Sequence, residues 1–84
     1  YFRELAASEV VAADDARADP RTREFVADYL PDLGVGALLD VPLRPFGRLE
    51  GVLCCEHVGP ARAWAADEQV FAVAVGNLVS LAQE

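Results

Sequence analysis

Apolar positions along this chain follow strand-like spacing in its centre and helical spacing towards its ends. Two apolar runs, residues 37–44 and 49–58, flank residues 45–48, whose proline and glycine favour a hairpin turn. Both faces of these strands carry apolar side chains, which is typical of a sheet that is covered on both faces. A shorter apolar run at residues 10–13 predicts another buried strand.

Helical periodicity marks three further segments. Residues 1–9 fit the end of a helix. A second helix is predicted over residues 20–30, because Asp19 can cap free backbone N–H groups and Pro20 suits the first helical position. The third covers residues 66–83 and is apolar around almost its whole circumference, so we expect it to be buried on more than one side.

The register of the hairpin decides which side chains share a face. A turn of residues 45–48 places Leu39 opposite Cys54 and Asp40 opposite Leu53. A bulge in the turn would shift every pair by one residue and exchange the two faces of one strand.

Composition and charge restrict the class of protein. The chain has 84 residues, of which 54% are hydrophobic and 25% charged, and this fits one globular domain at most. Its 14 acidic and 7 basic residues give a net charge of −7, which disfavours contact with nucleic acid or anionic membranes. No apolar run approaches the ~20 residues of a transmembrane helix. Because the chain lacks Met and opens at Tyr1, we expect a fragment of a longer protein.

The two cysteines, Cys54 and Cys55, are adjacent in the sequence. Neighbouring side chains of a strand point to opposite faces, so the pair is expected to be reduced, which indicates a reducing, cytoplasmic compartment. No basic neighbour is evident that would lower a thiol pKa, so we interpret both as small core residues rather than redox groups.

A set of short motifs extends over nearly the whole chain. They are Tyr29-Leu30, Leu33-Gly34-Val35, Leu39-Asp40-Val41-Pro42-Leu43, Gly47-Arg48-Leu49-Glu50-Gly51-Val52-Leu53, and a tail of Glu56-His57-Val58-Gly59, Arg62, Trp64, Asp67-Glu68 and Phe71. Together with the order of the elements, they resemble the later part of a GAF domain, and the tail is similar to a subgroup common in bacterial sensor kinases and cyclases. The resemblance implies an α+β fold, in which an antiparallel sheet has helices on both faces. The family's N-terminal helix and first strands are expected to be missing, so residues 1–84 would form a partial GAF-like sensory domain.

The resemblance also implies a function. Most GAF domains are non-catalytic, bind a small molecule between the sheet and the connecting helices, and signal through terminal helices that pair across a dimer. We therefore expect a bacterial sensor that regulates an attached output domain of the histidine kinase or diguanylate cyclase type. It is expected to form a homo-oligomer through helix 66–83, where Gly76 favours the close approach of another backbone. Two alternatives remain open: a thiol-dependent reductase of the free-methionine-sulfoxide-reductase kind that uses Cys54 or Cys55, and a ligand-free dimerisation module.

Candidate ligand-binding residues lie in the polar loop after the first strand, on the following helix and on the hairpin. They are Asp14, Arg17, Asp19, Phe25, Tyr29, Leu39, Asp40 and Cys54. Arg17 could clamp an anionic ligand, or it could pair with its own acidic neighbours.

Metal and cofactor chemistry is not expected. His57 shares a strand face with Cys55 and could approach Asp40, but a structural histidine is the more frequent case. Cys55-Glu56-His57 does not resemble the bilin-attachment motif of phytochrome-like GAF domains. We therefore expect no catalytic residue, no metal and no cofactor. Arg62 is expected to pair with Glu56, and Trp64 to close the core before the last helix.

Overall fold

The computed structural model describes residues 1–29 and 34–84, apart from the side chains of residues 2, 25, 28 and 29. Its centre is an antiparallel sheet with the order β1 (Val11–Ala13), β2 (Val35–Leu43) and β3 (Gly51–Val58). The long central strand β2 is buried along its whole length, because it pairs on both edges and is covered on both faces. The predicted hairpin and the short first strand are confirmed.

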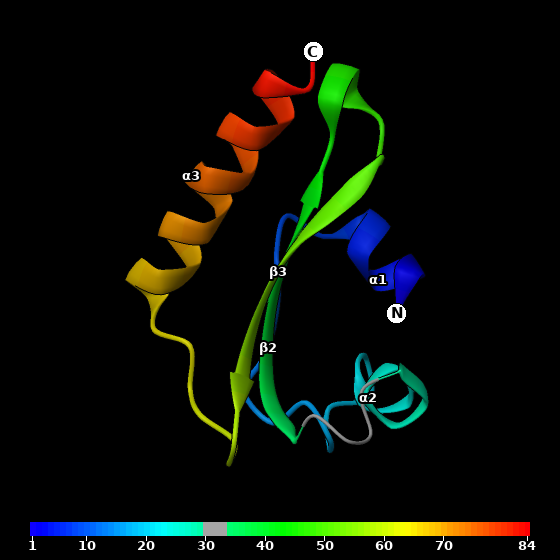
Figure 1. Cartoon of the computed structure of the whole chain (residues 1–84), viewed down its shortest axis with the longest axis vertical. Helices are drawn as coiled ribbons and strands as arrows, with labels where there is room; N and C mark the ends of the chain where they lie inside the picture. Colours follow the sequence, from blue (N-terminus) through cyan, green and yellow to red (C-terminus); the bar gives the residue numbers. More distant parts are fainter. Residues whose placement is uncertain (30–33) are drawn as a thin grey trace.

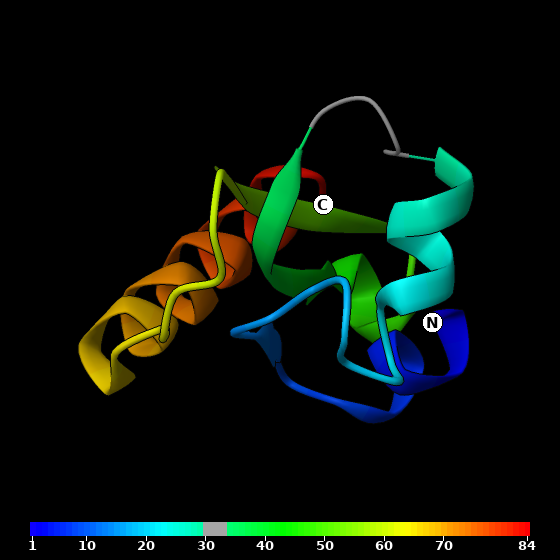
Figure 2. The ribbon, with the colours of Figure 1, turned by 90° about the horizontal axis from the view of Figure 1, so that it is seen from below.

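Helices cover both faces of the sheet, as the apolar pattern predicted. The long helix α3 (Ala66–Ala82) lies along one face, and α1 (Phe2–Ala7) and α2 (Arg23–Tyr29) lie on the other (Figures 1 and 2). This arrangement confirms the α+β fold class. Helix α2 begins later than predicted, because residues 20–22 form turns before the first helical residue. The predicted role of Asp19 is confirmed, since its carboxylate accepts the backbone N–H of Arg21 at 2.9 Å.

The hairpin register differs by one residue from the simple turn. Asp40 lies opposite Cys54, and Leu39 lies opposite Cys55. The connection contains a 3-10 turn, Pro45–Gly47, in which Phe46 has a positive φ of 55°, and the Glu50 N–H closes the hairpin on the Leu43 carbonyl at 3.0 Å. The prediction that Leu39 faces Cys54 is therefore wrong, and the alternative of a one-residue shift is correct.

Helix α3 packs on the sheet through small residues. A Cβ atom on Gly76 would lie only 2.7 Å from Cγ1 of Val41 in β2. Ala72 packs with Leu39 and Val41 in the core of this face. The glycine in mid-helix is thus explained by the chain's own sheet, and the prediction that it marks the approach of another backbone is not needed.

Arg44, directly after β2, ties the ends of two helices together. Its guanidinium Nη2 donates to the carbonyls of Leu5, Ala6 and Ser8 at 3.2, 3.0 and 3.0 Å, which satisfies free carbonyls at the C-terminus of α1. Its backbone N–H donates to Oγ of Ser80 in the last part of α3 at 3.0 Å. One residue therefore holds α1 from one face of the sheet and α3 from the other.

Candidate functional site

A buried carboxyl group lies on the face of the sheet that carries α1. Asp40 sits in the middle of β2 and is only 1% exposed. Its Oδ2 accepts a hydrogen bond from the hydroxyl of Tyr1, the residue before α1. Its Oδ1 has no hydrogen-bond partner among the described residues. A buried oxygen without a partner is unfavourable by roughly 1–3 kcal/mol, so this atom requires an explanation.

The surroundings of Asp40 disfavour its negative charge. Burial raises the pKa of this carboxyl above its usual range, and the nearby charge of Glu56 raises it further. Hydrogen-bonding contacts from the Tyr1 hydroxyl, the Cys54 thiol and the Cys55 backbone N–H lower the pKa of Asp40. Burial and Asp40 together raise the pKa of the Tyr1 hydroxyl well beyond its usual range.

Cys54 lies opposite Asp40 on the adjacent strand, and its side chain is exposed. Burial of part of the thiol and the neighbouring Asp40 raise the pKa of Cys54 to about 11. A thiol with so high a pKa is almost fully protonated at neutral pH and is a poor nucleophile. The interpretation of both cysteines as core residues is wrong for Cys54, and only Cys55 packs against the core.

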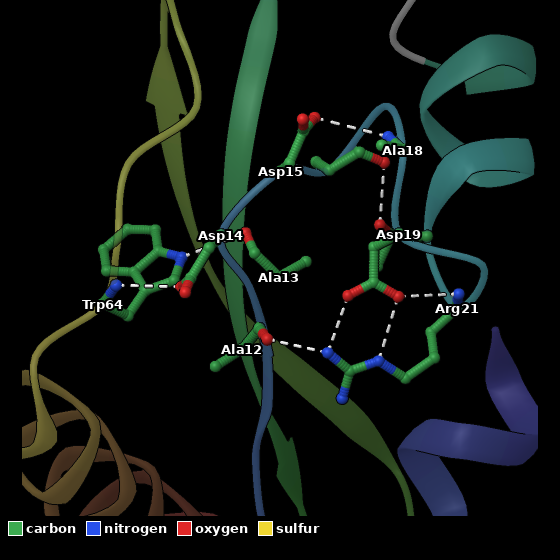
Figure 3. A network of polar contacts seen from close by, with 10 residues as sticks. Ala12, Ala13, Asp14, Asp15, Ala18, Asp19, Arg21 and Trp64 are labelled. Atoms are coloured by element: carbon green, nitrogen blue, oxygen red, sulfur yellow. Dashed lines mark hydrogen bonds and ion pairs between the residues drawn. The ribbon is translucent and has the colours of Figure 1, made fainter.

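The polar loop after β1 is held together by one arginine (Figure 3). Arg21 forms a two-pronged pair with Asp19, in which Nε donates to Oδ1 at 3.0 Å and Nη2 to Oδ2 at 2.7 Å. Nη2 also donates to the Ala12 carbonyl at 2.8 Å, which ties the loop to β1. The guanidinium holds the pKa of Asp19 below its usual range. The Asp19 carboxylate is therefore already paired with Arg21.

The other end of this loop supports the start of α3. Oδ1 of Asp14 accepts the backbone N–H of Trp64 at 2.9 Å, and the Trp64 indole donates to the Ala13 carbonyl at 3.2 Å (Figure 3). The guanidinium of Arg62 lies 4.5 Å from the centre of the Trp64 ring and donates to Glu68 at 2.5 Å. Asp14 thus supports the segment before α3. The predicted pairing of Arg62 with Glu56 is wrong, because Glu68 is its partner.

Arg17 is exposed, and it makes neither a hydrogen bond nor an ion pair with any residue that the structure describes. The interpretation that Arg17 pairs with its acidic neighbours is therefore wrong, since Arg21 takes the carboxylate of Asp19. Among residues 1–29 and 34–84, the three ion pairs are Asp19–Arg21, Arg48–Glu50 and Arg62–Glu68.

The predicted site residues thus divide into separate groups. Asp40 and Cys54 lie side by side, whereas Leu39 points to the opposite face and lines a groove under α3. Phe25 and Tyr29 belong to α2, but their side chains lie outside the described part of the chain. Sequence reasoning missed Tyr1 as a partner of Asp40, because 39 positions separate the two residues and no local pattern links them.

The groove between α3 and β3 has a volume of about 610 Å³. Its walls are largely apolar and include Leu39, Leu53, Cys55, Trp64 and Phe71. Asp67 and Glu68 also line it, so a mostly apolar surface meets two carboxyl groups here.

Metal binding receives no support from the geometry. His57 pairs with Ala37 across the hairpin and lies on the same face of β3 as Cys55, opposite to the face of Asp40. The described residues contain no group of three His, Cys, Asp or Glu side chains that could hold a metal ion. The possible approach of Asp40 to His57 is therefore wrong, because the one-residue shift in register separates them.

The sequence matches the GAF domain family over residues 3–83, so the chain belongs to this family. GAF domains are, in general, sensory modules without catalytic activity. A similar solved structure is GAF3 from Slr1393 of Synechocystis sp. PCC6803 in its photoproduct state, with a TM-score of 0.79 and 25% sequence identity. The alignment covers 94% of this chain and 49% of the other, so this chain spans about half the length of that structure.

No curated protein matches the sequence. Within the described residues, no helix is both long and apolar enough to cross a membrane.

Proposed function

We propose that this GAF domain binds a small molecule on the α1 and α2 face of the sheet and regulates an attached output domain. The output domain would be of the histidine kinase or diguanylate cyclase type, in a cytoplasmic bacterial signalling protein. The observation that carries this proposal is Asp40, which is fully buried and still has one oxygen without a partner. A sheet interior that needs only packing has no use for such a group, whereas a ligand site uses it for recognition.

We also propose that the sensor works as a homodimer through α3. Its outer face carries Phe71, Ala74, Leu78 and Leu81, which follow the alternating three- and four-residue spacing of a coiled-coil seam. Phe71 and Leu78 are 71% and 67% exposed. The occupant that fits this seam is the same helix of a second copy, because identical seams are complementary to each other.

The rival function is a thiol-dependent reductase. Its strongest candidate nucleophile is Cys54, which is exposed, but the raised thiol pKa of about 11 argues against it. The described part of the chain places no basic side chain in an ion pair or hydrogen bond with either cysteine, and such a group is the usual device for lowering a thiol pKa.

A panel of cytoplasmic metabolites, screened by thermal shift, tests the sensing function. We expect at least one compound to raise the melting temperature of the wild-type chain and to lose this effect in Asp40→Ala. Cys54→Ser and Cys55→Ser should retain it, because neither thiol acts chemically. A panel without any stabilising compound would favour the ligand-free dimerisation module. Turnover of methionine sulfoxide that disappears in Cys54→Ser would favour the reductase.

A further inference from the structure

The face of the sheet around Asp40 is acidic. Glu56 on β3 lies opposite Leu38 on β2, and Leu38 is two positions before Asp40. Because side chains alternate between the two faces of a strand, the carboxyl groups of Glu56 and Asp40 lie on the same face of the sheet. Neither carboxyl group forms an ion pair with the residues that the structure describes. The one uncommitted arginine of the nearby loop, Arg17, does not reach them.

The oxygen atoms of Asp40 are not equivalent. Oδ2 accepts the Tyr1 hydroxyl, and Oδ1 remains open. An ionised carboxylate oxygen only accepts hydrogen bonds, so the partner that suits the ionised form of Asp40 is a donor. A donor that carries positive charge would form the stronger bond and would also offset the negative potential of Glu56.

Resting on the proposed sensing function, we propose that the ligand presents a cationic nitrogen group, such as an ammonium, amidinium or guanidinium, to Oδ1 of Asp40. Glu56 supplies a second, exposed negative charge on the same face of the sheet. Phosphate or carboxylate ligands are disfavoured on this face, because two carboxyl groups would repel them. A compound that lacks the donor would leave the buried Oδ1 of Asp40 unpaired. The site would therefore discriminate strongly between ligands that carry this donor and related compounds that do not.

A ligand that reaches Oδ1 would have to approach over β3. Cys54 and Glu56, the neighbours of Asp40 on that strand, are both exposed, whereas α1 and Tyr1 cover Asp40 from the other side.

Benzamidine and its uncharged analogue benzamide provide the test, because they share a ring and differ in charge. Titrations of the 84-residue chain are followed by amide chemical shifts in NMR spectra. We expect benzamidine to shift the amides of residues 38–42 and 52–56 and to bind about tenfold or more tightly than benzamide. Asp40→Asn should weaken the binding of benzamidine by about tenfold or more, and the matched exposed variant Asp67→Asn should leave it unchanged.

Glu56→Gln provides a second variant, at an exposed position, in case Asp40→Asn does not fold. We expect it to weaken benzamidine binding several-fold. Equal binding of benzamide, unchanged affinity in both variants, or no shift at millimolar benzamidine would each overturn the inference and leave water as the partner of Oδ1. Phosphate and citrate are titrated in parallel. If an anion binds this face, the sensing function stands and the cationic ligand is excluded; if the metabolite panel also yields nothing, both fail.

Discussion

At the scale of single residues, the most unusual feature of this chain is the buried carboxyl group of Asp40. Apolar residues fill nearly all the other buried positions of the sheet, whereas Asp40 brings a carboxyl group into it. The sequence predicted Asp40 and Cys54 as candidate site residues, and the two lie side by side, but it could not predict Tyr1, which reaches Asp40 only through the folded arrangement of α1. It also selected Arg17 over Arg21, because the choice between two nearby arginines depends on loop geometry that no spacing reveals.

Asp40→Asn should change the pH dependence of stability. Because burial raises the pKa of Asp40 in the folded chain, the folded state binds this proton more tightly than the unfolded state does. The contribution of Asp40 to the free energy of unfolding therefore falls as pH rises from the unfolded pKa of about 3.9 through the raised folded value. We expect Asp40→Asn to remove this fall and to be the more stable protein near neutral pH.

Urea unfolding of both proteins, measured at a series of pH values between about 4 and 8, checks this prediction. The groups that face Asp40, namely Tyr1 from α1 and Cys54 and Glu56 from β3, remain in both proteins. Asp67→Asn on the exposed surface of α3 serves as the control. An identical pH slope in the wild type and in Asp40→Asn would contradict the argument.

Gly76→Ala is expected to destabilise the fold, although alanine is the better helix former by about 1 kcal/mol. The added Cβ would lie 2.7 Å from Cγ1 of Val41, inside van der Waals contact, and overpacking of this kind costs about 1–3 kcal/mol. Denaturant unfolding measures the change. Asn77→Ala, on the exposed side of the same helix, should raise stability slightly, and Val41→Ala combined with Gly76→Ala should recover part of the loss.

At the scale of elements, the sequence predicted each helix and strand but placed several boundaries and one register wrongly. Periodicity identifies elements because burial of one face is the main driving force, whereas the register depends on the conformation of a few turn residues. Phe46 has a positive φ, which is uncommon for residues other than glycine. The connection between β2 and β3 therefore differs from the simple four-residue turn that the sequence predicted. The late start of α2 is a further boundary difference, since residues 20–22 form turns although Asp19 accepts the backbone N–H of Arg21.

The N-terminus of α3 is only half capped, and a single substitution should complete it. Glu68 accepts the backbone N–H of Ala65 at 2.9 Å, but Ala65 has no side-chain oxygen to return the bond. Ala65→Thr should therefore stabilise the chain by about 1 kcal/mol. Thermal unfolding measures the gain, and Ala66→Thr, one residue inside the helix, should show none. Equal effects of the two threonines would mean that the gain does not come from capping.

At the scale of the whole molecule, the apolar seam on α3 leads to a prediction about assembly. Leu78→Glu should shift the chain towards the monomer, because it places a charge in the centre of the proposed helix pair. Sedimentation at low micromolar concentration gives the measurement, and Asn77→Glu is the matched control beside it. Leu78 is exposed in the single chain, so the monomer should keep its fold. A wild-type chain that sediments as a monomer would refute the proposed dimer.

The double attachment of Arg44 has a consequence for how any signal leaves the domain. Because one residue holds the carboxyl end of α1 through its side chain and Ser80 of α3 through its backbone, the two helices do not choose their positions independently. Coupling of this kind is reciprocal: a ligand that displaces α1 alters the freedom of the last turns of α3, and a load on α3 alters the docking of α1 to the same extent in free energy. A conformational change in any segment attached after α3 would then change the affinity of the domain for its ligand.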